Sequence, residues 1–235
     1  TVPLDGIAVP GGPGGSQSVV AIALNVTAVG PTDASFLTVW PSGADRPVAS
    51  SLNFASNDTR ANLVVVGVGE DDRSVDIYNQ FGSTHLLVDV FGVYLLAETA
   101  RNDQAGRLLP IEPFRSFDSR LDSPYDPPGR IPANRSIIFG NYFGWTDIWN
   151  VTAVNPTSNG FLSVLGFDPE DPNTEFPTTS NVNFRAGETV ANGVYAFGAP
   201  NTELFNPFGE THVVIDRFGY LTPRLQRPVD ELWNG

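Results

Sequence analysis

The chain has 235 residues, of which 41% are hydrophobic, and 26 acidic against 13 basic residues give it a formal net charge of −13. This length and composition suit a globular protein of one large or two small domains, and the negative charge argues against a nucleic-acid partner. Cysteine is absent, which excludes disulfides and thiolate metal sites, and no apolar run approaches the roughly 18 residues of a membrane-spanning helix.

Short apolar runs separated by turn residues predict a series of strands in the first half of the chain. In residues 19–29 (VVAIALNVTAV), Val20, Ile22, Leu24 and Val26 share one face and small or polar residues share the other. The runs FLTVW, SLNF, ANLVVVGVG, SVDIYN and HLLVDVFGVYL follow in order. Because no window has helical periodicity, we predict an antiparallel sandwich or barrel.

The second half of the chain repeats the first. Matching segments occur in the same order at offsets that drift only between 125 and 130 residues. The matched starting residues are Asn25 and Asn150 (NVTAV), Phe36 and Phe161 (FL), Ser50 and Ser180 (NF), Tyr78 and Phe205 (N.FG), and His85 and His212. Such a series indicates two copies of one unit. We therefore predict an all-β fold of two antiparallel β-sandwich-like domains of the jelly-roll or Ig-like kind, related by internal duplication.

The repeat sets the predicted domain boundaries. The first domain spans residues 1–98 and the second spans residues 107–222, with a C-terminal tail at residues 223–235. The segment AETARNDQAG, residues 97–106, is polar and without pattern, so we interpret it as the linker. The acidic segment GFDPEDPNTEFP, residues 166–177, is longer than its counterpart in the first copy and is expected to be a surface loop.

The ordered motifs NVT.V.PT, FL.V, NF, YN and TH..(V/I)D.FG resemble a β-rich repeat of about a hundred residues from secreted and surface proteins of actinobacteria and related bacteria. That repeat often occurs in tandem and accompanies peptidase or other hydrolase domains. The resemblance covers nearly the whole chain. It implies a β-rich module at the cell surface and no settled biochemical activity.

The opening motif of that repeat, P.R..DTR, is present in only one copy. The second copy has PFRSFDSR, with Arg115, Asp118 and Arg120 in place and Ser119 for the usual threonine. The first copy lacks it, so either the chain was cut from a longer parent or the copy is incomplete. An incomplete sandwich leaves an unpaired edge. We expect a neighbouring subunit's terminus, such as the tail TPRLQRPVDELWNG, to complete it.

Composition favours an exported protein. Every basic residue is arginine, methionine is absent, and the chain starts at Thr1 without a signal-like segment. With the acidity and the lack of cysteine, these features favour a mature protein that is secreted or held at the surface of a bacterium. The six arginines from Arg101 to Arg135 are interleaved with carboxylates, which favours local ion pairs over a binding patch.

Two matched His/Asp pairs invite a catalytic interpretation. His85 is followed four residues later by Asp89, and His212 by Asp216. On a strand, such positions lie about 13 Å apart and cannot bond to each other. A triad with a distant serine is disfavoured, because the arrangement occurs twice and no G-x-S-x-G motif is present. We expect no catalytic site and interpret these residues as structural groups bonded to backbone or turns.

Two charged clusters are candidates for ligands or metals. Arg115, Asp118 and Arg120 form either an anion site or, as we favour, an ion-pair network that pins a strand to the sheet edge. Hard oxygen ligands for calcium occur at residues 70–72 and in the acidic loop, where the candidates are Asp168, Glu170 and Asp171. No other cofactor is expected, since two histidines in different copies cannot build a zinc site alone.

The tryptophans divide into two groups. Trp145 and Trp149 replace Val20 and Leu24, so we expect them in the core, with Asp147 unexplained among them. Trp40 and Trp233 have no counterpart and are expected, with Arg115 and Arg120, to contact a ligand or partner. The asparagines that recur in both copies are expected to bond backbone at turns or bulges.

These observations favour a non-catalytic extracellular structural or adhesion module that assembles through sheet edges and loops. Its expected partners are further copies of itself or other surface proteins, joined by strand complementation. The alternative is a carbohydrate-binding accessory module of a secreted hydrolase, with polysaccharide as its ligand. Neither interpretation involves a nucleic acid or a membrane span.

Overall fold

The computed structural model describes residues 2–3, 19–69, 74–95, 108–122, 128–140, 146–167, 179–196 and 201–221. Every regular element in these ranges is a β-strand, which confirms the all-β class. The first domain contains β1 (Val2–Pro3), β2 (Val19–Val29), β3 (Ser35–Pro41), β4 (Leu52–Phe54), β5 (Thr59–Gly67), β6 (Ser74–Asn79) and β7 (His85–Leu95). The second contains β8 (Leu108–Asp118), β9 (Arg135–Gly140), β10 (Thr146–Val154), β11 (Gly160–Phe167), β12 (Val182–Phe184), β13 (Thr189–Ala196), β14 (Asn201–Asn206) and β15 (His212–Leu221).

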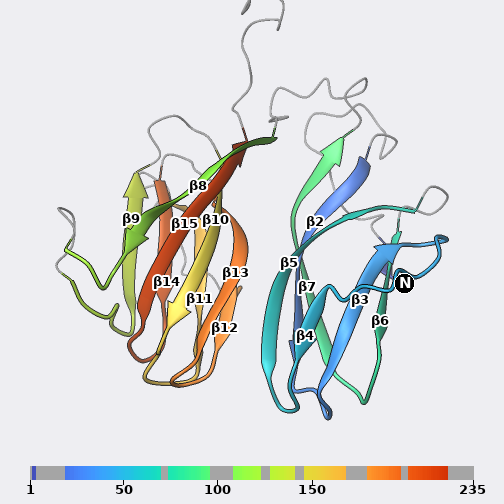
Figure 1. Cartoon of the computed structure of the whole chain (residues 1–235), viewed down its shortest axis with the longest axis horizontal. Helices are drawn as coiled ribbons and strands as arrows, with labels where there is room; N and C mark the ends of the chain where they lie inside the picture. Colours follow the sequence, from blue (N-terminus) through green and yellow to red (C-terminus); the bar gives the residue numbers. More distant parts are fainter. Residues whose placement is uncertain are drawn as a thin grey trace, which may run out of the picture.

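The strands form two pairs of antiparallel sheets, one pair in each domain (Figure 1). The second domain has the sheets β12-β11-β14-β9 and β13-β10-β15-β8, and the first has β4-β3-β6-β1 and β5-β2-β7. Each strand of the first domain thus occupies the place of its sequence counterpart, and β1 takes the place of β9. Among the described residues, β8 alone has no counterpart. The predicted pair of β-sandwich-like domains is confirmed. The described part of the chain has no helix that could cross a membrane.

The predicted domain boundaries fall outside the described residues. The strands of the first domain lie within residues 2–95 and those of the second within residues 108–221. The linker at residues 97–106 and most of the acidic loop also fall outside them. The exact ends of the domains therefore stay predictions.

Each domain has its own core between its two sheets. In the first domain, Ile22, Leu24 and Val26 of β2 are fully buried in this core, as their alternation predicted. Val20, expected on the same face, is exposed, because the pairing of β2 with β7 shifts register between Val19 and Ala21 and the strand end leaves the core. Alternation alone does not reveal such an irregularity.

In the second domain, the core position of Leu24 is taken by Trp149. Trp149 is buried, and its ring meets that of Phe139 edge-on at 5.2 Å, which confirms its predicted core position. Trp145 lies outside the described residues. The unexplained Asp147 is buried and forms an ion pair with Arg217 on β15, whose side chain is 35% exposed. Arg217 stands where the first domain has Val90, so the second domain has an ion pair at the two positions that Ile22 and Val90 occupy in the first.

Three of the four pairs of recurring asparagines hold equivalent bonds in the two domains, and the exception is Asn25 with Asn150. Asn62 donates to the Ser51 carbonyl at 2.7 Å, and its counterpart Asn192 donates to the Asn181 carbonyl at 2.7 Å. Asn79 and Asn206 donate to turn carbonyls, whereas Asn53 and Asn183 donate to the hydroxyls of Ser50 and Ser180. The structural interpretation of these residues is confirmed, with serine hydroxyls taking the place of backbone for one pair.

A buried polar contact joins the two domains, and no feature of the sequence predicted it. Asn25 and Asn192 are 0% and 3% exposed, and the Asn192 amide donates to Asn25 Oδ1 at 3.0 Å. Asn25 in turn donates to the Ser180 carbonyl at 2.9 Å, and the Leu63 N–H donates to Asn192 Oδ1 at 2.7 Å. The outer face of β2 is therefore buried as fully as its inner face.

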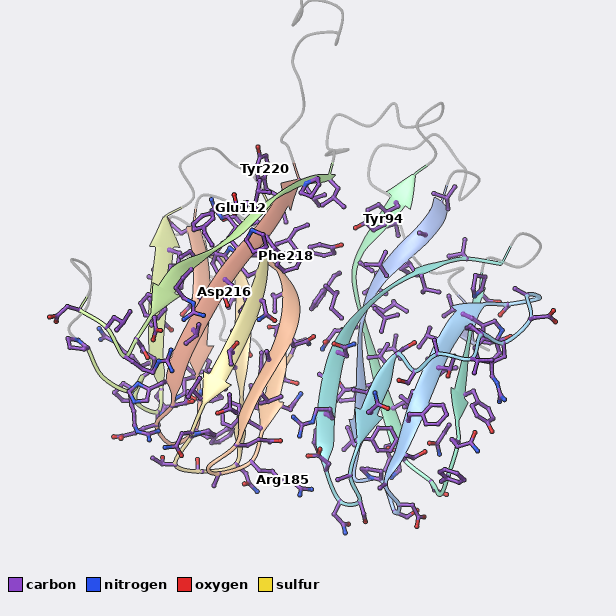
Figure 2. All side chains as sticks on the ribbon, viewed as in Figure 1. Tyr94, Glu112, Arg185, Asp216, Phe218 and Tyr220 are labelled. Atoms are coloured by element: carbon purple, nitrogen blue, oxygen red, sulfur yellow. The ribbon has the colours of Figure 1, made fainter. Side chains whose placement is uncertain are left out.

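Apolar and ionic contacts extend this interface, which places β5 beside β12 and β13 (Figure 1). The Tyr94 and Tyr195 hydroxyls bond to each other, and burial together with this bond raises the pKa of Tyr195 above its ordinary value. Arg60 pairs with Asp58 of its own domain and with Glu188 of the other. Figure 2 shows Tyr94 toward one end of the interface and Arg185, which pairs with Asp58, toward the other.

Candidate functional site: an open sheet edge

In the second domain, β8 covers the edge of β15. It pairs antiparallel with it, so that Phe117 lies opposite Ile215 and Arg115 opposite Asp216, with Ser116 bulged between them. Just beyond β8, the Ser119 N–H donates to the Val213 carbonyl, and the Val213 N–H donates to Ser119 Oγ, both at 2.9 Å. The backbone of Val213 thus faces β8, and its edge groups are satisfied.

An ion-pair network fixes β8 in place. Arg115 Nε donates to Asp216 Oδ1 at 2.5 Å, and Arg115 Nη1 donates to Asp118 Oδ2 at 3.1 Å. Asp118 also accepts from the Arg120 guanidinium and from the Arg120 N–H. The hydrogen bond from Arg120 outweighs burial and holds the pKa of Asp118 well below its usual range. The sequence grouped Arg115, Asp118 and Arg120 but missed Asp216, which binds a guanidinium and not the expected backbone or turn group (Figure 2).

We expect Asp118→Asn to weaken the acid dependence of folding. Because the pKa of Asp118 is lower in the folded state than its unfolded value of about 3.9, the carboxylate stabilises the fold above that pH, and the contribution is lost as the pH falls through the folded pKa. Urea unfolding from pH 7 down to pH 2 should therefore show the wild type and Asp118→Asn converging in stability below about pH 4. The exposed Asp122→Asn serves as the control, and a wild-type to Asp118→Asn difference that stays constant over this range would contradict the prediction.

His212 holds the chain that follows β8. Its Nδ1 lies 3.2 Å from the Gly129 carbonyl and 3.3 Å from Ser119 Oγ. A carbonyl oxygen can only accept, so the bond to Gly129 puts the proton on Nδ1, and this nitrogen cannot then take a proton from Ser119. The pair therefore holds the end of β8, and Nδ1 cannot serve as a base for Ser119. Ser119 could have been noticed earlier, because it keeps the hydroxyl of the usual threonine.

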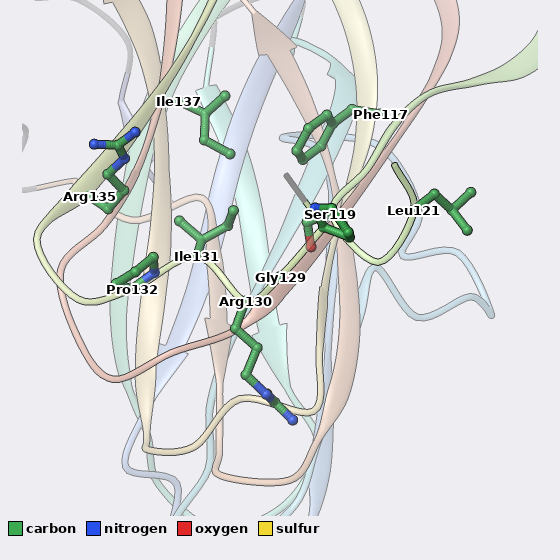
Figure 3. Close-up of a pocket in the computed structure, with 10 residues that line it drawn as sticks. Phe117, Ser119, Leu121, Gly129, Arg130, Ile131, Pro132, Arg135 and Ile137 are labelled. Carbon is green, nitrogen blue, oxygen red and sulfur yellow. The ribbon is translucent and has the colours of Figure 1, made fainter. Parts of the chain in front are cut away.

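The segment after β8 closes over the start of β15 (Figure 3). Ile131 exchanges backbone hydrogen bonds with Thr211 at 2.7 and 3.1 Å. Beneath this cover lies a cavity of about 340 Å³ with an apolar floor that includes Phe117, Ile131 and Ile137. Figure 3 shows Arg130 and Arg135 pointing away from this floor in different directions. The cover and β8 together bury one whole edge of the second domain.

The corresponding edge of the first domain is open. β7 pairs with β2, and no described strand lies on its other side. Leu86 and Leu87 are 39% and 55% exposed, whereas their counterparts Val213 and Val214 are 0% and 4% exposed. Val90 is also exposed, at 44%. Since Leu86 occupies the place of Val213, its N–H and C=O face the open edge. Within the part of the chain that the structure describes, this edge therefore offers both unpaired backbone groups and apolar side chains.

The two polar side chains of the open edge, His85 and Asp89, have no partner among the described residues. His85 is exposed and Asp89 half-buried, and no described group bonds to the imidazole of His85 or to the carboxylate of Asp89. Their counterparts His212 and Asp216 bind the end of β8 and Arg115. The structural role expected for His85 and Asp89 stays a prediction, because the strand that would give them partners is absent from the described first domain.

The remaining predicted contact residues are dispersed. Trp40 is half-buried at the end of β3, and its indole N–H donates to the Ala44 carbonyl at 3.0 Å. The described residues contain no group of three or more histidines and carboxylates that could hold a metal ion. Trp233, the acidic segment at residues 70–72 and the calcium candidates Asp168, Glu170 and Asp171 lie outside the described residues.

A scan against known protein families, a search of characterised proteins and a search of solved structures each found no match to this chain. The function is therefore inferred from the geometry of the open edge.

Proposed function

We propose that this chain is a tandem-repeat, non-catalytic structural or adhesion module that acts outside the cell, secreted or at the cell surface, and assembles through sheet-edge and loop contacts. The observation that carries the proposal is the contrast between β7 and β15. The same strand position is covered in one domain and open and apolar in the other.

An open edge of this kind favours pairing. Natural sheets protect their free edges with prolines, charges or bulges, because unpaired N–H and C=O groups recruit further strands. β8, the outer strand of the second domain, carries such protection in Pro110, Pro113 and Arg115. On the outer edge of β7, the exposed side chains include Leu86, Leu87 and Val90. The first domain is therefore suited to accept a strand and the second is not.

The contact between the domains supports a structural role. Buried amides at Asn25 and Asn192, the tyrosine pair and the ion pairs around Arg60 fix the two sandwiches against each other. Fixed domains give a building unit a defined shape, and pairing at one edge can then position successive units.

The proposal of a non-catalytic protein is supported by the histidines. His212 Nδ1 donates to the Gly129 carbonyl and so cannot serve as a base for the neighbouring Ser119, and the His85 imidazole has no described partner that could orient it. We expect His85→Ala to behave as the wild type in a panel of esterase, peptidase and glycosidase assays. Any hydrolysis that the wild type performs and His85→Ala loses would contradict the proposal.

The assembly is tested by charging the edge. Leu87→Lys combined with Val90→Lys places two charges on β7, which should abolish self-association, because like charges and lost apolar area both oppose strand pairing. The matched control is Val48→Lys, at a fully exposed loop residue. Sedimentation velocity over a concentration series should show that the wild type and Val48→Lys associate and that the β7 double variant does not. Equal association of all three proteins would refute the proposed edge.

One groove favours carbohydrate binding as a second candidate function. It has a volume of about 360 Å³, lies where the domains meet, and is lined by amides, Asp58 and the rings of Phe161 and Phe208. These rings pack edge-to-face at 5.6 Å, and Phe208 is exposed. Exposed rings beside amides and carboxylates suit a pyranose. A glycan array and a pull-down on insoluble polysaccharide test it, with Phe208→Ala expected to lose binding and Trp40→Ala, outside this groove, as the comparison.

A further inference from the structure

We infer that the open edge of β7 is completed by residues 224–230 of a second copy of this chain, which pair antiparallel to β7 with Arg227 opposite Asp89. This inference rests on the proposed assembly through sheet edges and names its partner. It would link the first domain of each molecule to the tail of the next.

The β8–β15 pair defines what a completing strand must carry. An arginine must lie opposite the aspartate of the edge, as Arg115 lies opposite Asp216. The next residue is bulged, and the one after it must be apolar and point inward, as Phe117 does where its ring meets Phe139 edge-on at 5.4 Å. An aspartate follows at Asp118. The required pattern is therefore arginine, any residue, an apolar residue and aspartate.

The chain contains this pattern three times. One instance is β8 itself, at Arg115 to Asp118. A second, RSVD, begins at Arg73 and runs into β6, which is already paired on both sides by β1 and β3. The third is RPVD, from Arg227 to Asp230, in the C-terminal tail. Only the tail offers this pattern outside the described strands.

The details of the tail sequence agree with the β8 template. Pro228 falls at the place of the bulged Ser116, and proline within sheets is found at bulges and edges. Val229 falls at the place of Phe117 and would lie opposite Val88. Leu86, on the same inward face of β7 two residues before Val88, is exposed in the structure. Arg227 would give Asp89 the guanidinium that Arg115 gives Asp216. Backbone pairing, apolar burial and charge therefore agree on one register.

The pairing is proposed between copies because the tail and the open edge belong to different domains. Leu221, the last described residue before the tail, ends β15 of the second domain, whereas Asp89 lies on β7 of the first. Both strands run toward the same end of the molecule (Figure 1). A tail that folds back on the edge of its own chain is the alternative, and the mixing experiment below distinguishes the two arrangements.

The test is a charge exchange in the full-length chain. Asp89→Arg alone and Arg227→Asp alone each place like charges opposite each other, and each should weaken self-association by about tenfold or more in sedimentation equilibrium. A mixture of the two variants should recover the wild-type affinity, because each edge then meets a tail of opposite charge. Asp45→Arg, at an exposed turn, controls for the change in net charge.

The register is tested by disulfide cross-linking. The chain has no native cysteine, so only the introduced cysteines can form a disulfide. Val88→Cys in one chain and Val229→Cys in another should give a disulfide-linked dimer on mixing and mild oxidation. Val48→Cys mixed with Val229→Cys should give none. Equal yields from the two mixtures would overturn the proposed register.

The outcomes separate this inference from the function on which it depends. If charging β7 abolishes association but the Arg227 variant does not, the edge is used by another strand and the inference fails alone. If neither variant changes an association that is observed, both fail. A wild-type chain that stays monomeric at about 1 mM overturns both. A further variant carries both Asp89→Arg and Arg227→Asp in one chain. If this variant recovers the wild-type behaviour but the mixture of the two single variants does not, the tail folds back on its own edge, and the pairing between copies is overturned.

Discussion

Replacing Arg217 with valine is expected to lower the free energy of unfolding of the second domain by about 3 kcal/mol. The change leaves the Asp147 carboxylate buried beside β15 without its guanidinium partner. A buried charge that loses its partner keeps the cost of desolvation and loses the attraction that offset it. The prediction is checked by urea unfolding of Arg217→Val at neutral pH.

The first domain supplies the matched control for this experiment. It has Ile22 and Val90 where the second domain has Asp147 and Arg217. The double variant Asp147→Ile with Arg217→Val should therefore recover most of the lost stability, because an apolar pair of similar volume often replaces a buried ion pair without cost. A double variant as unstable as Arg217→Val would contradict this account and point to a loss of packing instead.

The second large effect is expected at the contact between the domains. Asn192→Ala removes the partner of three groups: the Leu63 N–H, Asn25 Oδ1 and the Asn181 carbonyl. Each buried group left without a hydrogen bond costs about 1 to 3 kcal/mol. We expect a loss of about 3 kcal/mol in total and a weaker coupling between the unfolding of the two domains.

Asn62→Ala is the control, because the repeat places it at the same position. Asn62 makes the equivalent bond to the Ser51 carbonyl but none to the other domain. Its replacement should cost about 1 kcal/mol, so the difference between the two variants measures the contact between domains. Chemical unfolding followed by amide hydrogen exchange checks both values. Equal losses for the two variants would mean that the Asn25–Asn192 bond contributes nothing to stability.

The proposed assembly has a direction. The open edge lies on the first domain and the tail follows the second, so each contact joins different surfaces of two identical molecules. Contacts of this kind give rings if they close and open chains if they do not. Electron microscopy of the associated wild type would distinguish these forms, and the fixed contact between the domains would set the spacing along them.

Much of the fold could be predicted because its signals are local. The alternation at Ile22, Leu24 and Val26 marks a strand with one core face, and the turn residues between runs mark its limits. The first copy lacks the PFRSFDSR motif. This absence predicts that β8 has no counterpart in the first domain, and none occurs among the described strands. The missing motif could be recognised by comparing the two copies within one chain, because that comparison needs only the order of the motifs.

The sequence by itself determined which segments are strands and which motif one copy lacks, because strand period and repeat are properties of neighbouring residues. Only the tertiary structure decided what the outer faces meet. Asn25 is matched by sequence to Asn150 but bonds Asn192, and Asp147 is balanced by Arg217 from a strand far along the chain. Such pairings depend on how sheets twist and which faces pack together, so residues distant in the sequence become partners only after the chain has folded.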